Sequence, residues 1–119
     1  MMTRETRQSA ELLKAAADSN RLRILKCLQV RPACVCELVQ ATGMPQPRVS
    51  RHLKVLRDAG LVTDSREAQW VVYALAQLPA ETPQAEVLAL ISHWLETAAD
   101  VQGDREGLRH ASRESCGRL

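Results

Sequence analysis

The sequence contains no phenylalanine, and aromatic residues make up only 3% of its 119 residues. A hydrophobic core must therefore be built mainly from leucine, valine, isoleucine and alanine. The sequence also has no apolar run near the ~20 residues that span a bilayer, and its first five residues lack the apolar segment of a signal peptide. Because a chain of this length is too short for two ordinary domains, we expect one globular unit in the cytoplasm.

Motifs of the common enzyme classes are missing as well. The sequence has no glycine-rich phosphate loop, no His-Glu-x-x-His motif and no nucleophile elbow. Only the four cysteines would support an enzyme, as thiol nucleophiles. We therefore expect a protein that is not an enzyme and requires no cofactor.

Positive charge is concentrated in one stretch of a chain whose formal net charge is +2. Between Met44 and Arg66, five basic residues stand against two acidic ones, a net charge of 5 − 2 = +3, so the remainder is about neutral. A basic stretch is typical of nucleic-acid contact, but it is equally typical of an ordinary solvated helix face. Charge alone does not decide between them.

Hydrophobic periodicity predicts three helices before the basic stretch, over residues 5–17, 21–29 and 33–41. Asp18, Ser19 or Asn20 can supply the N-cap oxygen of the second helix. Gly43 ends the third helix, because glycine readily adopts the left-handed conformation. A fourth helix begins near Pro47, which suits a first helical turn, and stops at Gly60.

After Gly60, β-branched and aromatic residues predict a hairpin with strands over residues 61–66 and 69–75. Its turn lacks the glycine or asparagine of a tight hairpin, so we expect a tip longer than two residues. A last helix is expected over residues 82–100. The interpretation is a domain of residues 1–102 followed by a flexible tail of residues 103–119.

This order of elements, mainly α with a small β-hairpin, is that of a winged helix-turn-helix. Residues 44–59 then supply the recognition helix, with Val49, Leu53 and Leu56 facing inward. The candidate DNA contacts are the outward positions of this helix and one wing residue: Gln46, Pro47, Arg48, Ser50, Arg51, His52, Lys54 and Arg66. For His52, packing beneath the wing is an open alternative to a base contact.

Such a protein is expected to act as a homodimer on double-stranded DNA. One recognition helix reads only a few base pairs, so two are normally placed on the half-sites of a pseudo-palindromic operator. The first and last predicted helices have apolar faces and lie outside the helix-turn-helix. We expect them to form the dimer surface; the alternative is that they only cover the core of the monomer.

Cys34 and Cys36 stand one residue apart at the predicted start of the third helix. In a reducing compartment, such thiols are suited to soft metals or redox chemistry. Residues two apart in a helix point about 200° apart, so a helical pair cannot easily chelate one ion. Ion binding is therefore expected to distort the first turn of this helix, which precedes the recognition helix.

Five segments between residues 12 and 94 resemble the ArsR-type (ArsR/SmtB) metalloregulatory repressors, particularly their arsenic-responsive branch. They are Asn-Arg-Leu-Arg-Ile at 20–24, Cys-Val-Cys-Glu-Leu at 34–38, and residues 46–53, 56–61 and 70–73. The resemblance implies a repressor of an arsenic-resistance operon. It also implies that As(III) or Sb(III) binds the thiolates of Cys34 and Cys36 and releases the operator DNA.

The sequence departs from the family pattern at one position. A further family cysteine commonly lies three residues after the second, where this chain has Val39. Cys116, Cys27 and a small solution thiol are the alternatives for a third ligand. Cys27 lies among apolar residues, where a free cysteine usually behaves as a small buried apolar side chain.

Other ligands and chemistries stay open at this point. Cadmium or bismuth would also suit the thiols, whereas the zinc site on the last helix of related repressors has only His93 to match it. A redox switch would oxidise Cys34 and Cys36, or one of them with Cys116, to a disulfide. A thiol enzyme such as an arsenate reductase has only the cysteines in its favour.

Overall fold

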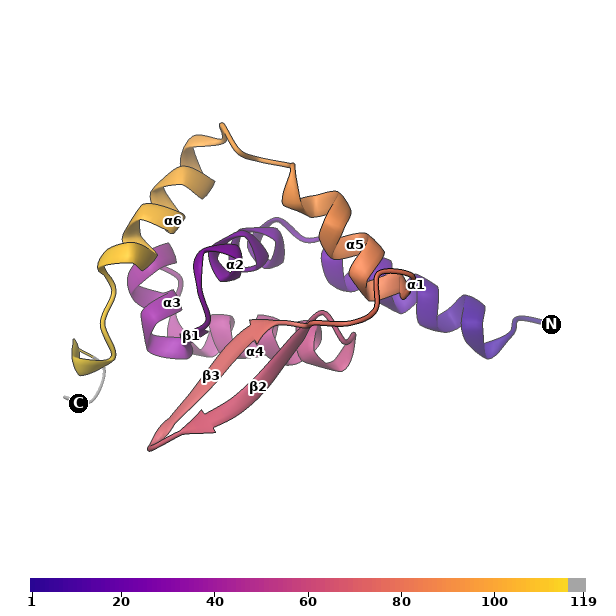
Figure 1. Cartoon of the computed structure of the whole chain (residues 1–119), viewed down its shortest axis with the longest axis horizontal. Helices are drawn as coiled ribbons and strands as arrows, with labels where there is room; N and C mark the ends of the chain where they lie inside the picture. Colours follow the sequence, from indigo (N-terminus) through magenta and orange to yellow (C-terminus); the bar gives the residue numbers. More distant parts are fainter. Residues whose placement is uncertain (116–119) are drawn as a thin grey trace.

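The computed structural model describes residues 1–115, which form six α-helices, a short 3₁₀ turn and three strands. In chain order these are α1 (Arg4–Ala16), α2 (Ser19–Val30), β1 (Ala33–Cys34), α3 (Val35–Thr42), α4 (Gln46–Asp58), β2 (Val62–Glu67), β3 (Trp70–Leu75), α5 (Pro83–Ser92), α6 (Ala99–His110) and η1 (Arg113–Ser115). The β2–β3 hairpin projects from the helices as the wing (Figure 1). Across residues 1–115, no helix is long and apolar enough to cross a membrane.

The helix ends follow the local signals in the sequence. The Asp18 carboxylate caps α2 by accepting hydrogen bonds from the backbone N–H groups of Asn20 at 2.9 Å and Arg21 at 3.0 Å. Gly43 and Gly60 have φ angles of 74° and 81°, in the left-handed region that glycine adopts without strain. The predicted stops at these two glycines are confirmed.

Replacing Asp18 with alanine is expected to lower the free energy of unfolding by about 1 kcal/mol at pH 7. The N–H of Arg21 holds the pKa of Asp18 below its ordinary value of 3.8. The contribution of the charge is therefore fully present above the unfolded pKa and is lost as the pH falls through the lowered folded pKa. Urea denaturation between pH 7 and pH 2 measures this, and Asp18→Asn, which keeps a capping oxygen, is the control.

The core is formed around α2, with α3 and α4 packed against it. Ile24 and Leu25 of α2 and Leu38 of α3 are buried, as are the three predicted inward residues of α4, Val49, Leu53 and Leu56. Because these three fix the inner face of α4, its other face is turned to solvent. The helix-turn-helix arrangement predicted from the periodicity is confirmed.

The wing belongs to a three-stranded antiparallel sheet in the order β1-β3-β2. Strand β1 lay in the predicted third helix, but Cys34 pairs with Val72 of β3 instead. The expectation of a longer tip was wrong, because Glu67 pairs with Trp70 and leaves two residues between them. Ala68 makes this tight turn by adopting a φ of 55°, which the sequence does not signal.

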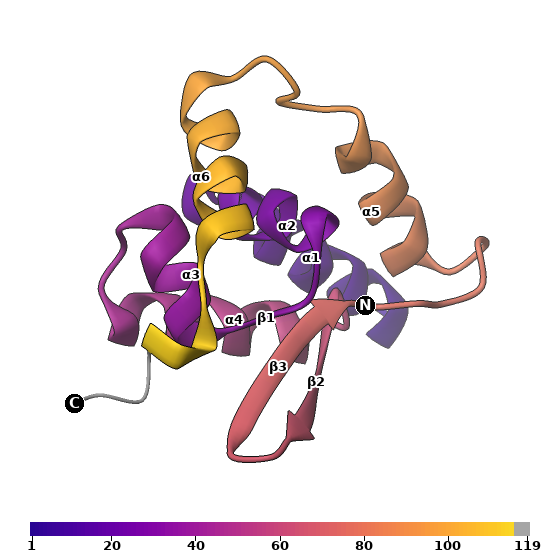
Figure 2. The same cartoon turned by 60° about the vertical axis from the view of Figure 1, so that its left-hand side comes forward.

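The C-terminal region differs most from the sequence-based expectation. In place of one helix over residues 82–100, α5 ends at Ser92 and the chain turns through Leu95, whose φ is 64°. The expected flexible tail is wrong for residues 103–110, which belong to α6. This helix buries Val101, Asp104 and Leu108, and it lies beside α2 and α3 (Figure 2).

Two glycines of α6 test this packing. A Cβ added at Gly107 would lie 3.0 Å from the carbonyl oxygen of Ala41 in α3, whereas one added at Gly103 would meet nothing within 4 Å. Both alanine variants gain the same helix propensity. We therefore expect Gly103→Ala to be more stable than Gly107→Ala by about 1–3 kcal/mol, measured by thermal unfolding. Equal stabilities would mean that α6 does not pack against α3.

Candidate nucleic-acid interface and cysteine site

The outer face of α4 presents most of the predicted DNA contacts. Gln46, Pro47, Arg48, Arg51 and Lys54 are exposed, and Ser50 is half-buried. Lys54 forms a surface ion pair with Asp58 at 3.1 Å. Within residues 1–115, the side chains of Arg48 and Arg51 form no hydrogen bond or ion pair, so both exposed guanidinium groups are available to a ligand. Arg66 is likewise exposed, near the tip of the wing on β2.

His52 is placed differently from its neighbours on α4. It is half-buried, and its Nδ1 lies 3.3 Å from Nη1 of Arg21 on α2. Burial holds the pKa of His52 below 6.5, which favours the neutral ring. The half-buried ring therefore contacts Arg21 of α2.

The sulfur atoms of Cys34 and Cys36 lie 3.3 Å apart. Cys34 precedes α3 with an extended backbone, φ −88° and ψ 168°, and only Cys36 is within the helix. The two side chains consequently converge without any unwinding. The premise of the expected distortion, that both cysteines are helical, was therefore wrong.

Glu37 closes a hydrogen-bonded ring with Cys34. Its buried carboxylate accepts from the Cys34 N–H at 3.1 Å and from the Cys34 thiol at 3.3 Å, and Arg31 binds its other oxygen at 2.9 Å. Burial raises the pKa of the Cys34 thiol, and the nearby Glu37 carboxylate raises it further. Burial also opposes the charge of Glu37, but the hydrogen bonds from Cys34 and Arg31 outweigh it and keep its pKa below 4.5. Sequence reasoning missed Glu37; its position three residues after an N-cap was the available signal.

A groove of about 510 Å³ opens beside the two sulfur atoms. It runs between α3 and the wing, and both cysteines and Ser115 line it. The other lining residues are apolar or glutamine: Val35, Val39, Val71, Trp70, Gln40, Gln46 and Gln69. A small thiol-binding ligand can thus reach the cysteine pair from solvent.

Cys27 stands apart from this pair. Cys27 is buried in the core, where burial raises the pKa of its thiol to about 12. No group of three or more His, Cys, Asp and Glu side chains in the described range 1–115 is arranged to hold a metal ion, so Cys27 does not join Cys34 and Cys36. Cys116 lies outside the described residues.

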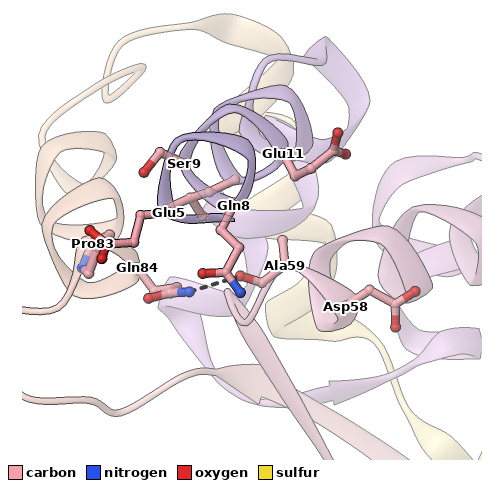
Figure 3. Close-up of a pocket in the computed structure, with 9 residues that line it drawn as sticks. Glu5, Gln8, Ser9, Glu11, Asp58, Ala59, Pro83 and Gln84 are labelled. Atoms are coloured by element: carbon pink, nitrogen blue, oxygen red, sulfur yellow. Dashed lines mark hydrogen bonds between the residues drawn. The ribbon is translucent and has the colours of Figure 1, made fainter. Parts of the chain in front are cut away.

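A second hollow, of about 390 Å³, lies where α1, the end of α4 and the start of α5 meet (Figure 3). Glu5, Glu11 and Asp58 line it together with polar residues, and Gln84 donates a hydrogen bond to the carbonyl oxygen of Ala59 at 3.3 Å. It has no cysteine or histidine in its lining. It therefore lacks the sulfur and nitrogen ligands that a soft ion prefers.

A known protein family matches the region of the chain that contains the cysteine pair and α4. Residues 18–64, which include the cysteine pair and α4, match the family model described as bacterial regulatory protein, arsR family. A homodimeric winged helix-turn-helix domain from Mycobacterium bovis, described as a possible ArsR-family regulator, superposes with a TM-score of 0.64 at 31% identity, over 76% of this chain and 83% of its own. The chain belongs to the ArsR family. The fold and family predicted from the sequence are confirmed.

Of two curated relatives, one is named for arsenic resistance and the name of the other states no ligand. Over 74 residues, 61% of this chain, it is 43% identical to the arsenic resistance transcriptional regulator ArsR1 of Pseudomonas putida. Over 68 residues, 57% of this chain, it is 47% identical to the transcriptional repressor SmtB of Mycobacterium tuberculosis. These matches span only 56% and 50% of the two relatives. Both relatives are named as regulators of transcription, in agreement with the expectation of a protein that is not an enzyme.

Proposed function

We propose that this ArsR-family protein is a dimeric transcriptional repressor of an arsenic-resistance operon, released from its operator when As(III) or Sb(III) binds Cys34 and Cys36. The observation that supports this most directly is the 3.3 Å approach of the two sulfur atoms at the edge of the wing sheet. Thiolates are the side-chain ligands that soft ions prefer.

For DNA recognition, the proposal assigns the base contacts to the exposed face of α4. Arg48 and Arg51 bind guanine edges in the major groove, with Gln46 and Pro47 at the leading end of the helix. Ser50, Lys54 and the wing residue Arg66 bind phosphates. His52 is left out of this set, because its ring is engaged with Arg21.

The cysteine pair is connected to both parts of the DNA-binding surface. Cys34 pairs with Val72 of β3, which forms half of the wing, and α3 packs against α4. A ligand on the two sulfurs therefore acts on the wing and the recognition helix together. Release follows if the ligand-bound geometry of these elements differs from the geometry that fits DNA.

For As(III), the proposal requires a third ligand. Each As–S bond replaces an As–OH bond, and the thiol proton leaves with the hydroxide as water. The proposal does not use Cys27, because its side chain is buried in the core. We assign the third sulfur to Cys116, which follows directly on the groove residue Ser115 in the sequence.

The proposed dimer uses α1 and α5 rather than the last helix. Leu13 of α1, Leu90 of α5 and Trp94 just beyond it are large apolar side chains exposed to solvent. We expect Leu90→Glu to sediment as a folded monomer, while Leu78→Glu, at an exposed loop position, remains a dimer. A dimeric Leu90→Glu protein would contradict this surface.

The test of the ligand is an equilibrium titration of the reduced protein with arsenite, antimonite, cadmium and zinc, followed by the ultraviolet absorbance of metal–sulfur bonds. We expect arsenite and antimonite to bind, with affinity at least ~100-fold lower in Cys34→Ser and Cys36→Ser. Cys27→Ala is the matched control and should bind like the wild type. Tighter binding of zinc, or no dependence on Cys34 and Cys36, would contradict the proposal.

A redox switch predicts a different result. Burial raises the pKa of the Cys34 thiol, which disfavours rapid oxidation of this residue by peroxide. Mass spectrometry after mild peroxide treatment distinguishes the two functions. A rapidly formed disulfide that releases DNA without arsenite would replace the ion-sensing proposal.

A further inference from the structure

The two strands of the wing are attached to the rest of the domain in different ways. Strand β3 pairs with β1, where Cys34 lies opposite Val72. On β2, by contrast, only Val62 at the base is buried, and residues 63–67 are all exposed. Figure 2 shows the hairpin extending away from the helices beyond this base. Burial in the core therefore does not fix the outer part of β2 relative to α4.

One ion pair joins α4 to this outer part of β2. Nη1 of Arg57, in the last turn of α4, donates a hydrogen bond to Oδ2 of Asp64 at 2.9 Å. Within residues 1–115, no other side chain of α4 forms a hydrogen bond or ion pair with either strand of the wing. Because both side chains are partly exposed, the pair contributes little to the stability of the fold. It does, however, fix where β2 lies relative to α4.

The same pair connects the two surfaces that are proposed to contact DNA. Side chains two residues apart in a strand share a face, so Asp64 and Arg66 point to the same side of the wing. Arg48 and Arg51 are exposed on α4, in the turns before Arg57. Because DNA contacts the helix and the wing at once, the separation of these two surfaces must match the separation of groove and phosphate on the DNA.

A carboxylate at this place is unfavourable for DNA binding on charge alone. Asp58 and Asp64 are the only acidic residues between Met44 and Arg66. A negative side chain near the DNA surface repels phosphates, so removing it should strengthen binding. A carboxylate that holds the wing in place predicts the opposite sign. The direction of the change therefore distinguishes positioning from electrostatics.

We propose that Arg57 and Asp64 form a brace that positions the wing, so that Arg66 reaches a phosphate while α4 lies in the major groove. The inference rests on the DNA contacts of the proposed function, and it is independent of the ligand at the cysteines. By holding β2 before DNA arrives, the brace reduces the conformational freedom that the wing loses on binding.

The test compares Asp64→Asn with Glu67→Gln, by fluorescence anisotropy on the palindromic DNA upstream of the gene at one salt concentration. Each change removes one negative charge from an exposed position of β2, but Glu67 lies near Arg113 and not α4. We expect Asp64→Asn to bind ~3-fold more weakly than the wild type, whereas Glu67→Gln binds at least as tightly. Asp64→Glu keeps the carboxylate and should retain wild-type affinity. Thermal unfolding of all three should match the wild type.

A double-variant cycle completes the design. Arg66→Ala should weaken DNA binding less in Asp64→Asn than in the wild type, because a wing without the brace already presents Arg66 poorly. Additive losses, or an Asp64→Asn protein that binds DNA as tightly as Glu67→Gln, would overturn the brace. So would a fall in unfolding temperature large enough to explain the weaker binding. If the wild type does not bind this DNA, the proposed function itself fails.

Discussion

An Arg48→Ala/Arg51→Ala double variant is expected to bind operator DNA at least ~100-fold more weakly than the wild-type protein. Both side chains are exposed on α4. In the described part of the chain neither forms an ion pair, so DNA binding need not break an existing contact. Each bidentate arginine–guanine pair contributes about 1–3 kcal/mol of discrimination, and two such losses reach this factor.

Fluorescence anisotropy at one fixed salt concentration measures the effect, since phosphate contacts are strongly salt-dependent. Arg109→Ala is the matched control. It removes one positive charge, as each single variant Arg48→Ala and Arg51→Ala does, from the exposed end of α6, where within residues 1–115 the side chain pairs with Glu106. If this control weakens binding as much as Arg48→Ala or Arg51→Ala does, the effect is one of net charge, and α4 is not the recognition helix.

Replacing Asp104 with alanine is expected to lower the free energy of unfolding by about 3 kcal/mol. The buried Asp104 carboxylate accepts two hydrogen bonds from Arg23 of α2, at 2.7 and 2.8 Å. The same guanidinium group donates to the carbonyl oxygen of Thr42 at 3.0 Å. Without Asp104, a largely buried positive charge loses its partner, and α6 loses its main polar attachment.

Urea denaturation measures this change, with Glu106→Ala as the control for losing one negative charge on the same helix. Among the described residues, Glu106 pairs with exposed Arg109 and His110, so its removal should change stability little. Equal effects of the two variants would mean that the Arg23–Asp104 pair is not a structural contact.

Helix α4 was predictable because the residues that favour a helix locally are also the residues that the core buries. Val49, Leu53 and Leu56 recur at helical spacing, Pro47 suits a first turn, and Gly60 allows the chain to turn after the helix. When the apolar side of this helix is buried, Arg48 and Arg51 lie on its solvent-exposed side. The exposed arginine face of α4 therefore follows from periodicity alone.

Helix α6 was not predictable in this way, because its stability depends on partners far away in the sequence. From the sequence, Asp104 would be expected at the surface. It is instead buried and accepts a hydrogen bond from Arg23, which lies 81 positions earlier. Gly103 and Gly107 also weaken the helical signal, although Gly107 permits the close approach to Ala41. Tertiary contacts here outweigh intrinsic propensity.

The cysteine pair was recognised, but its geometry was not. Whether the two sulfurs converge depends on where α3 begins, and helix boundaries are poorly determined by sequence. Pairing of Cys34 with Val72 keeps it in β1 and moves the start of α3 to Val35. One residue of difference at this boundary brings two side chains that would diverge in a helix to a sulfur–sulfur distance of 3.3 Å.

The central claim is that a soft ion on Cys34 and Cys36 releases DNA, and one measurement tests it most directly. Reduced protein is bound to the fluorescent palindromic DNA upstream of its gene, and arsenite is titrated while anisotropy is recorded. We predict that the wild type is released, while Cys34→Ser/Cys36→Ser binds the DNA equally well and stays bound. Release of both proteins at the same arsenite concentration, or of neither, would contradict the account.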